Sequence, residues 1–97
     1  MFEVVIEERA EKEFYNAIEF YKNLNISGLS ERFYQDYLRT IELLELNPYF
    51  KKSSSVYRVI KFNKFPFLAF YKIYELEKVV KIVSFFHTSQ DPQKYPV

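Results

Sequence analysis

The segment from Val56 to His87 most constrains the fold of this 97-residue chain. It contains three runs of β-branched and aromatic residues, separated by the turn-prone pair Asn63–Lys64 and by the charged stretch 75–78. Apolar runs of this length, divided by short polar stretches, are typical of consecutive antiparallel strands. We therefore predict a three-stranded meander at about Val56–Phe62, Phe67–Glu75 and Val79–Phe86.

A short strand and two amphipathic helices are predicted before this segment. Met1–Ile6 is an almost uninterrupted apolar run, which favours a strand. From Glu8 to about Leu24, apolar residues recur with i, i+3, i+4 and i+7 spacing, which predicts a helix with one apolar face. A second helix with the same spacing is predicted up to about Leu46. It ends at Asn47, because the residue before a proline disfavours the α conformation.

The link between the two helices contains the only glycine of the chain, Gly28. Ser27 or Ser30 is placed to cap the second helix by accepting a hydrogen bond from a free backbone N–H group. A link this short favours an antiparallel helical hairpin. The element order β-α-α-β-β-β predicts an α+β fold, in which an antiparallel β-sheet packs against an N-terminal helical hairpin. We expect one domain over residues 1–97.

The composition excludes several classes of site. The chain has no cysteine, which excludes disulfides and thiolate metal ligands, and its single histidine makes a metal site improbable. One glycine cannot build a phosphate-binding loop, so no cofactor is expected. No signal-peptide pattern and no run of about 18 apolar residues is present, so we expect a cytoplasmic protein without membrane contact.

Charge is distributed unevenly along the chain. Residues 1–47 carry ten acidic and five basic side chains, whereas residues 48–97 carry nine basic and three acidic ones. If the second half forms the sheet, one side of the molecule is basic and could attract nucleic acid or an acidic partner. Alternatively, the lysines only deter edge-to-edge association of strands. The polar stretch 47–55 is expected to be an exposed loop.

Basic residues and tyrosines alternate in the second half of the chain. This mixture suits single-stranded RNA, whose phosphates are neutralised and whose bases stack, although composition alone favours core aromatics with solvated lysines. Arg58 lies inside an apolar run, so if buried it needs a carboxylate, phosphate or carbonyl partner. The candidates for RNA or target binding are Lys51, Lys52, Arg58, Lys61, Lys64, Tyr71 and Lys81.

His87 is the only histidine and stands where the last strand is expected to end. An imidazole there could act as a general acid or base, or could bind a phosphate. It could equally cap the strand end through a hydrogen bond. No serine, cysteine or carboxylate stands at a characteristic spacing, so the structural interpretation is favoured.

Ten short motifs follow one another in order along the chain. They are Ala10, Tyr21, Arg32-Phe33, Leu46-Asn47-Pro48, Tyr57-Arg58, Phe65-Pro66, Phe70-Tyr71, Val80-x-Ile82, His87 and Asp91-Pro92. In this order and spacing the chain resembles the RelE/ParE superfamily of bacterial type II toxins over nearly its whole length. The resemblance agrees with the β-α-α-β-β-β order reached from the residues.

The resemblance implies a growth-inhibiting toxin, of the kind linked to plasmid stabilisation, that a cognate antitoxin neutralises by wrapping its sheet and helices. Oligomers would form only through the antitoxin complex. RelE-like members cut messenger RNA on the ribosome, whereas ParE-like members poison DNA gyrase. Leu68 stands where a RelE-like member would offer an arginine, and no arginine follows His87. These departures favour a ParE-like toxin that acts by binding.

Two alternatives stay open. The first is a RelE-like, ribosome-dependent endoribonuclease that would use Arg58, His87 and Tyr95 as catalytic residues, while cations stabilise the charge that develops on the phosphate. The second is an inactive homologue or a protein-interaction module, because Gln90 replaces the arginine usual before Asp-Pro in ParE-like members.

Overall fold

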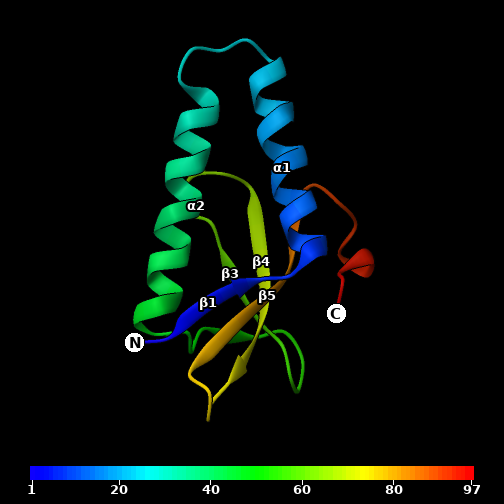
Figure 1. Ribbon diagram of the computed structural model, residues 1–97. Coiled ribbons are helices and arrows are strands. Elements are labelled where there is room, and N and C mark those ends of the chain that lie inside the picture. Colours follow the sequence, from blue (N-terminus) through cyan, green and yellow to red (C-terminus); the bar gives the residue numbers. More distant parts are fainter.

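The computed structural model describes all residues, 1–97, as a β-sheet with two long helices packed on one side (Figure 1). The predicted α+β class and the order of the main elements are confirmed. The elements are β1 (Glu3–Ile6), α1 (Glu8–Asn23), α2 (Leu29–Leu46), β2 (Lys51–Lys52), β3 (Arg58–Lys61), β4 (Phe67–Tyr74), β5 (Val79–His87) and the short 3₁₀ helix η1 (Pro92–Lys94).

The five strands form a single sheet in the order β1-β5-β4-β3-β2. The predicted meander is present, since β3 pairs antiparallel with β4, and β4 with β5. The sheet is mixed rather than purely antiparallel, because β1 runs parallel to β5, with Glu3 opposite Val79. Parallel neighbours need a long connection, and here the helical hairpin and the strands β2, β3 and β4 lie between the two strands in the chain.

Two local predictions are corrected by the structure. The stretch 47–55 is not only a loop, because Lys51 and Lys52 form the edge strand β2 against Val59 and Arg58. Neither Ser27 nor Ser30 caps α2. The N-cap is Gly28, in the left-handed conformation at φ 75°, and no side chain caps the helix. Glycine adopts this conformation without steric cost, so it closes the link and its carbonyl starts the helix.

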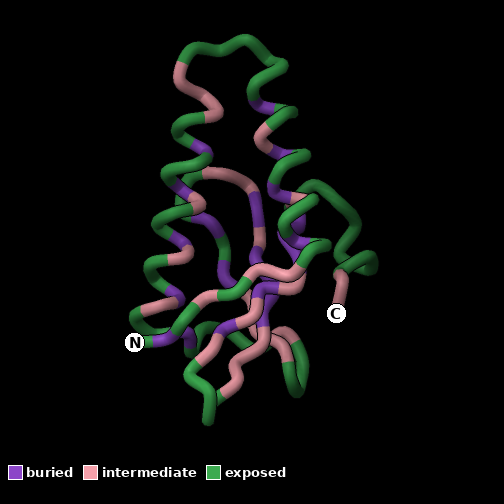
Figure 2. Tube along the Cα trace, in the orientation of Figure 1, coloured by how far each residue is buried: buried purple, intermediate pink, exposed green.

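The core lies between the helical hairpin and one face of the sheet, where the buried residues gather (Figure 2). The apolar stripe predicted on the first helix is confirmed, since Ala10, Phe14, Ala17 and Tyr21 are buried. Phe33 of α2 is 1% exposed and lies at the centre of the cluster. The rings within 5.8 Å of its own, centroid to centroid, are those of Phe14, Tyr21, Phe62, Phe65 and Phe67.

The C-terminal tail crosses the sheet face that the helices leave open. Phe70 lies between the core-facing residues Ala69 and Tyr71, so its side chain points to the open face. The Tyr95 ring packs on Phe70 and Phe86 there, with centroid distances of 5.0 and 5.1 Å. This contact closes Phe70 off from solvent completely. Neither helix is long and apolar enough to cross a membrane.

Candidate functional site

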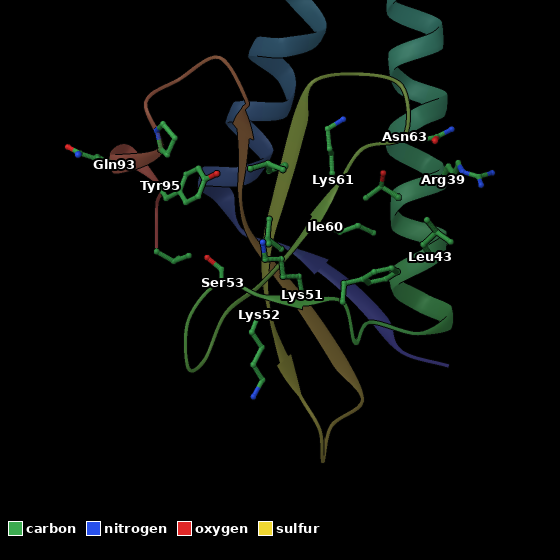
Figure 3. A pocket seen from close by; sticks show the side chains of 16 residues that line it. Arg39, Leu43, Lys51, Lys52, Ser53, Ile60, Lys61, Asn63, Gln93 and Tyr95 are labelled. Carbon is green, nitrogen blue, oxygen red and sulfur yellow. The ribbon is translucent and has the colours of Figure 1, made fainter.

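The largest cavity is an open groove of about 810 Å³ at the β2–β3 edge of the sheet. Tyr95 and Gln93 of the tail stand on one side of it, and Arg39 and Leu43 of α2 stand on the other (Figure 3). Lys61 of β3 lies between the two walls. Because β2 is only two residues long, it pairs with β3 at Arg58 and Val59 and leaves the outer edge at Lys61 without a neighbouring strand.

The groove is strongly basic. Arg39, Lys51, Lys52 and Lys61 line it, and no Asp or Glu side chain does. The ion pairs of the molecule join other residues, so none of these four cations has a carboxylate partner. The predicted concentration of positive charge on one side of the molecule is therefore present. Part of this concentration depends on the fold, because Arg39 comes from the acidic half of the sequence.

Arg58 lies outside the groove, on the helix-facing side of the sheet, where it pairs with Tyr71 of β4. Its Nη1 donates a hydrogen bond of 2.7 Å to the carbonyl oxygen of Phe50. The guanidinium also lies over the Tyr49 ring, 5.3 Å from its centroid. The Phe50 carbonyl is therefore the partner that a half-buried arginine requires. This hydrogen bond also holds the start of β2 against β3.

His87 lies at the other end of the sheet. Its ring meets Phe67 edge-on, and Nδ1 accepts a 3.0 Å hydrogen bond from the backbone N–H of Ser89. This contact ties the turn after β5 to the strand end, as the structural interpretation of His87 requires. Glu13 and Phe20 of α1 complete a second, smaller cavity beside the imidazole.

The fold does not bring the three candidate catalytic residues together. Arg58 faces Tyr71 and His87 faces Phe67, four residues apart along β4, which corresponds to about 13 Å along the strand. Tyr95 lies on the opposite face of the sheet from both. Acid–base chemistry needs its groups within hydrogen-bond reach of one reacting centre, and this arrangement does not supply one.

A family model described as the ParE toxin of the type II toxin-antitoxin system parDE matches residues 4–92. The chain belongs to the ParE toxin family.

Two solved structures share its fold at low sequence identity. The chromosomal ParDE TA system from P. aeruginosa contains a chain with 18% identity and a TM-score of 0.73, over 90% of this chain and 96% of that one. The isolated RelE toxin of E. coli has 14% identity and a TM-score of 0.60, over 96% of this chain and 90% of that one. No curated protein matches the sequence.

Within this ParE-family chain, the predicted binding residues divide into two groups. Lys51, Lys52 and Lys61 meet in the groove, and Tyr95 joins them there. Lys64 lies in the turn between β3 and β4, in a neighbouring cavity that shares Arg39 and Asn63 with the groove. The others lie apart: Lys81 is beside β1, 3.7 Å from Glu7, and Arg58 and Tyr71 face the helices. Sequence reasoning missed Arg39, although its spacing of seven residues from Arg32 places both arginines on one face of α2.

Tyr71 is a structural residue in this ParE-family fold and offers no surface to a ligand. Its side chain is 0% exposed, and its hydroxyl donates a 2.6 Å hydrogen bond to the carbonyl of Pro48. The same hydroxyl accepts a longer bond of 3.4 Å from the backbone N–H of Phe50. Burial raises the pKa of Tyr71 to about 12. The phenol thus anchors the chain between α2 and β2 to the centre of the sheet.

Tyr71→Phe is expected to lower the free energy of unfolding by about 1–2 kcal/mol, because the Pro48 carbonyl loses its partner. The variant should also lose less stability than the unmodified protein as pH rises, because the Tyr71 phenol no longer contributes to that loss. The folded chain keeps the Tyr71 and Tyr37 phenols protonated to about pH 12, whereas the unfolded chain releases those protons near 10.0, so stability is lost as pH rises between these values. Urea titrations at pH 7, 10 and 11 measure both effects. An unchanged pH dependence in the variant would contradict the assignment.

Proposed function

We propose that this chain is a ParE-like toxin that arrests bacterial growth by binding a cellular target in the cytoplasm, with DNA gyrase as the first candidate. The observation that carries the proposal is the match of the ParE toxin family to residues 4–92, almost the whole chain. The similar ParDE structure supports an antitoxin as the partner that neutralises the toxin.

The geometry supports binding rather than cleavage. A ribonuclease site would need Arg58, His87 and Tyr95 around one phosphate, whereas Arg58 is held by a carbonyl and the other two lie on opposite faces of the sheet. The unpaired cations of the groove offer a surface for a partner.

The helical hairpin supplies a second surface that a partner could cover. Both helices expose large apolar side chains, of which Tyr15 and Phe20 lie on α1 and Tyr34 and Leu38 on α2, and the exposed Leu24 directly follows α1. Contiguous apolar surface on a small protein usually marks an interaction site. We propose that the antitoxin covers this hairpin, and that oligomers form through the complex.

The proposal is tested by induced expression in a bacterial host, followed by a gyrase supercoiling assay with the purified protein. Growth arrest together with inhibited supercoiling is the expected result. A reconstituted translation reaction serves as the control for the alternative. Messenger RNA cut only in the presence of ribosomes would replace the binding proposal with the ribonuclease one, and the absence of any growth arrest would identify an inactive homologue.

The antitoxin surface has its own test. We expect Tyr34→Glu/Leu38→Glu to retain growth arrest but to escape neutralisation when the small protein encoded beside this gene is co-expressed, because two charges would enter an apolar contact. Ser55→Glu/Leu76→Glu is the matched control, since it adds the same charge at exposed positions away from the helices. Equal neutralisation of both variants would place the antitoxin elsewhere.

A further inference from the structure

A further cavity, distinct from the one beside His87, extends the basic groove along α2. It measures about 320 Å³ and shares Arg39 and Asn63 with the groove, so the two form one continuous surface. Its other cations are Arg32 of α2 and Lys64 of the β3–β4 turn. We define the basic track as Arg32, Arg39, Lys51, Lys61 and Lys64, all of them exposed. Lys52 is left out because its side chain points away from the other cations (Figure 3).

The charge of the basic track is not neutralised within the molecule. None of its five cations takes part in an ion pair. The only Asp or Glu side chain along it is that of Asp36, which is 5% exposed. Its two oxygens already accept hydrogen bonds from the backbone N–H groups of Asn63, Lys64 and Phe65. Asp36 therefore has no free oxygen directed at the neighbouring cations.

The cations stand on firmly held elements of one continuous surface. Arg32 and Arg39 are seven residues apart on α2, which separates them by about 10 Å along the helix axis. Asp36, between them, fixes the turn that carries Lys64 against α2. Lys61 and Lys51 lie on the neighbouring strands β3 and β2 at the edge of the sheet. Several separate cations on one surface match a ligand that carries several negative charges, rather than one with a single acidic group.

We propose that the basic track binds the phosphate backbone of a nucleic acid. Unpaired arginines and lysines on one surface supply the sequence-independent electrostatic attraction on which such binding depends. Hydroxyl and amide side chains of Ser53, Asn63 and Gln93 in the groove can donate to phosphate oxygens. Tyr95, 40% exposed and backed by Phe70 and Phe86, offers a ring on which an unpaired base can stack.

The inference goes beyond the proposed function and does not depend on which target the toxin inhibits. A toxin directed at gyrase works beside DNA, and one directed at ribosomes works beside RNA, so contact with a phosphate backbone is compatible with either target. The test uses only purified protein and oligonucleotides. A negative binding result would not change the conclusions from the growth and supercoiling assays. Negative growth and supercoiling assays would likewise not change the conclusion from the binding test.

Fluorescence anisotropy of labelled 20-residue probes tests the proposal. The probes are single-stranded RNA, single-stranded DNA of the same sequence, the DNA duplex, and a polyglutamate peptide as the protein-like anion. We expect at least one nucleic acid to bind, with a Kd that rises steeply between 50 and 200 mM salt. Arg39→Ala/Lys61→Ala should weaken binding about tenfold at 100 mM salt and lower the slope of log K against log salt by about 1.4 for single strands.

The matched control is Lys12→Ala/Lys22→Ala, which removes the same charge from exposed positions on α1. It should stay within about twofold of the unmodified protein, and circular dichroism melting verifies that both variants are folded. The ranking of RNA, single-stranded DNA and duplex identifies the source of the phosphates. The proposal would be overturned if the two variants lost the same affinity, or if no nucleic acid bound. It would also be overturned if polyglutamate bound as tightly as the nucleic acids and lost as much affinity in Arg39→Ala/Lys61→Ala.

Discussion

Phe33→Ala is expected to lower the free energy of unfolding by about 3–5 kcal/mol, the range for a phenylalanine removed from a packed core. Phe33 is 1% exposed, and its ring joins both helices to the sheet through Phe14 and Phe67. The surrounding rings are held by three different elements, so they cannot all move inward to fill the space. Most of the cavity should therefore remain.

Urea denaturation followed by circular dichroism measures this loss. Tyr34→Ala is the matched control, because it removes a neighbouring aromatic side chain of α2 that is 45% exposed. We expect this control to cost less than about 1 kcal/mol, as exposed substitutions usually do. A loss below about 1.5 kcal/mol for Phe33→Ala would show that the cluster repacks readily. That outcome would contradict a core centred on Phe33.

Asp36→Ala is expected to lower the free energy of unfolding by about 2–4 kcal/mol. Each hydrogen bond to a charged group contributes roughly 1.5–3 kcal/mol, and water can replace part of the loss because it can reach part of the turn after the change. The buried Asp36 carboxylate accepts three backbone N–H groups of the β3–β4 turn, at 2.8 to 3.1 Å. No residue of the turn can replace this acceptor. The turn should therefore loosen from α2.

The same denaturation experiment with two further variants separates the causes. Asp36→Asn keeps one carbonyl oxygen and should lose an intermediate amount of stability. Glu31→Ala removes an exposed carboxylate of the same helix and should change stability by less than about 0.5 kcal/mol. If Asp36→Ala cost no more than Glu31→Ala, the turn would be held by packing alone. The fixed position of Lys64 in the basic track would then lose its explanation.

The fold divides the two kinds of side chain that dominate the second half of the sequence. Phe62, Phe67, Tyr71 and Phe85 fill the space between the sheet and the helical hairpin, while lysines line the groove at the edge and Phe70, Phe86 and Tyr95 pack together on the open face. Strand alternation produces this division, because neighbouring residues point to opposite faces. Val59 and Lys61 consequently line the groove, whereas Arg58 between Tyr57 and Val59 does not and pairs with the core residue Tyr71.

Several features of the chain could be predicted from residues that are close together in sequence. The apolar stripe of α1, with Phe14 and Tyr21, follows from helical spacing, and Pro48 marks the end of α2. The apolar runs around Phe70 and Ile82 placed β4 and β5 within one residue of their observed ends. These features depend on local backbone preferences and on which face of an element is apolar, and both are properties of short stretches.

Other features depend on contacts between distant parts of the chain, which local patterns do not specify. The parallel pairing of β1 with β5, the carbonyl partner of Arg58 and the buried role of Asp36 all join residues that packing alone brings together. The sequence by itself determined the two helices, every strand but β2, their order and the membership of the toxin superfamily. Only the tertiary structure decided which cations share a surface, because Arg39 meets Lys61 only once α2 packs beside the sheet edge.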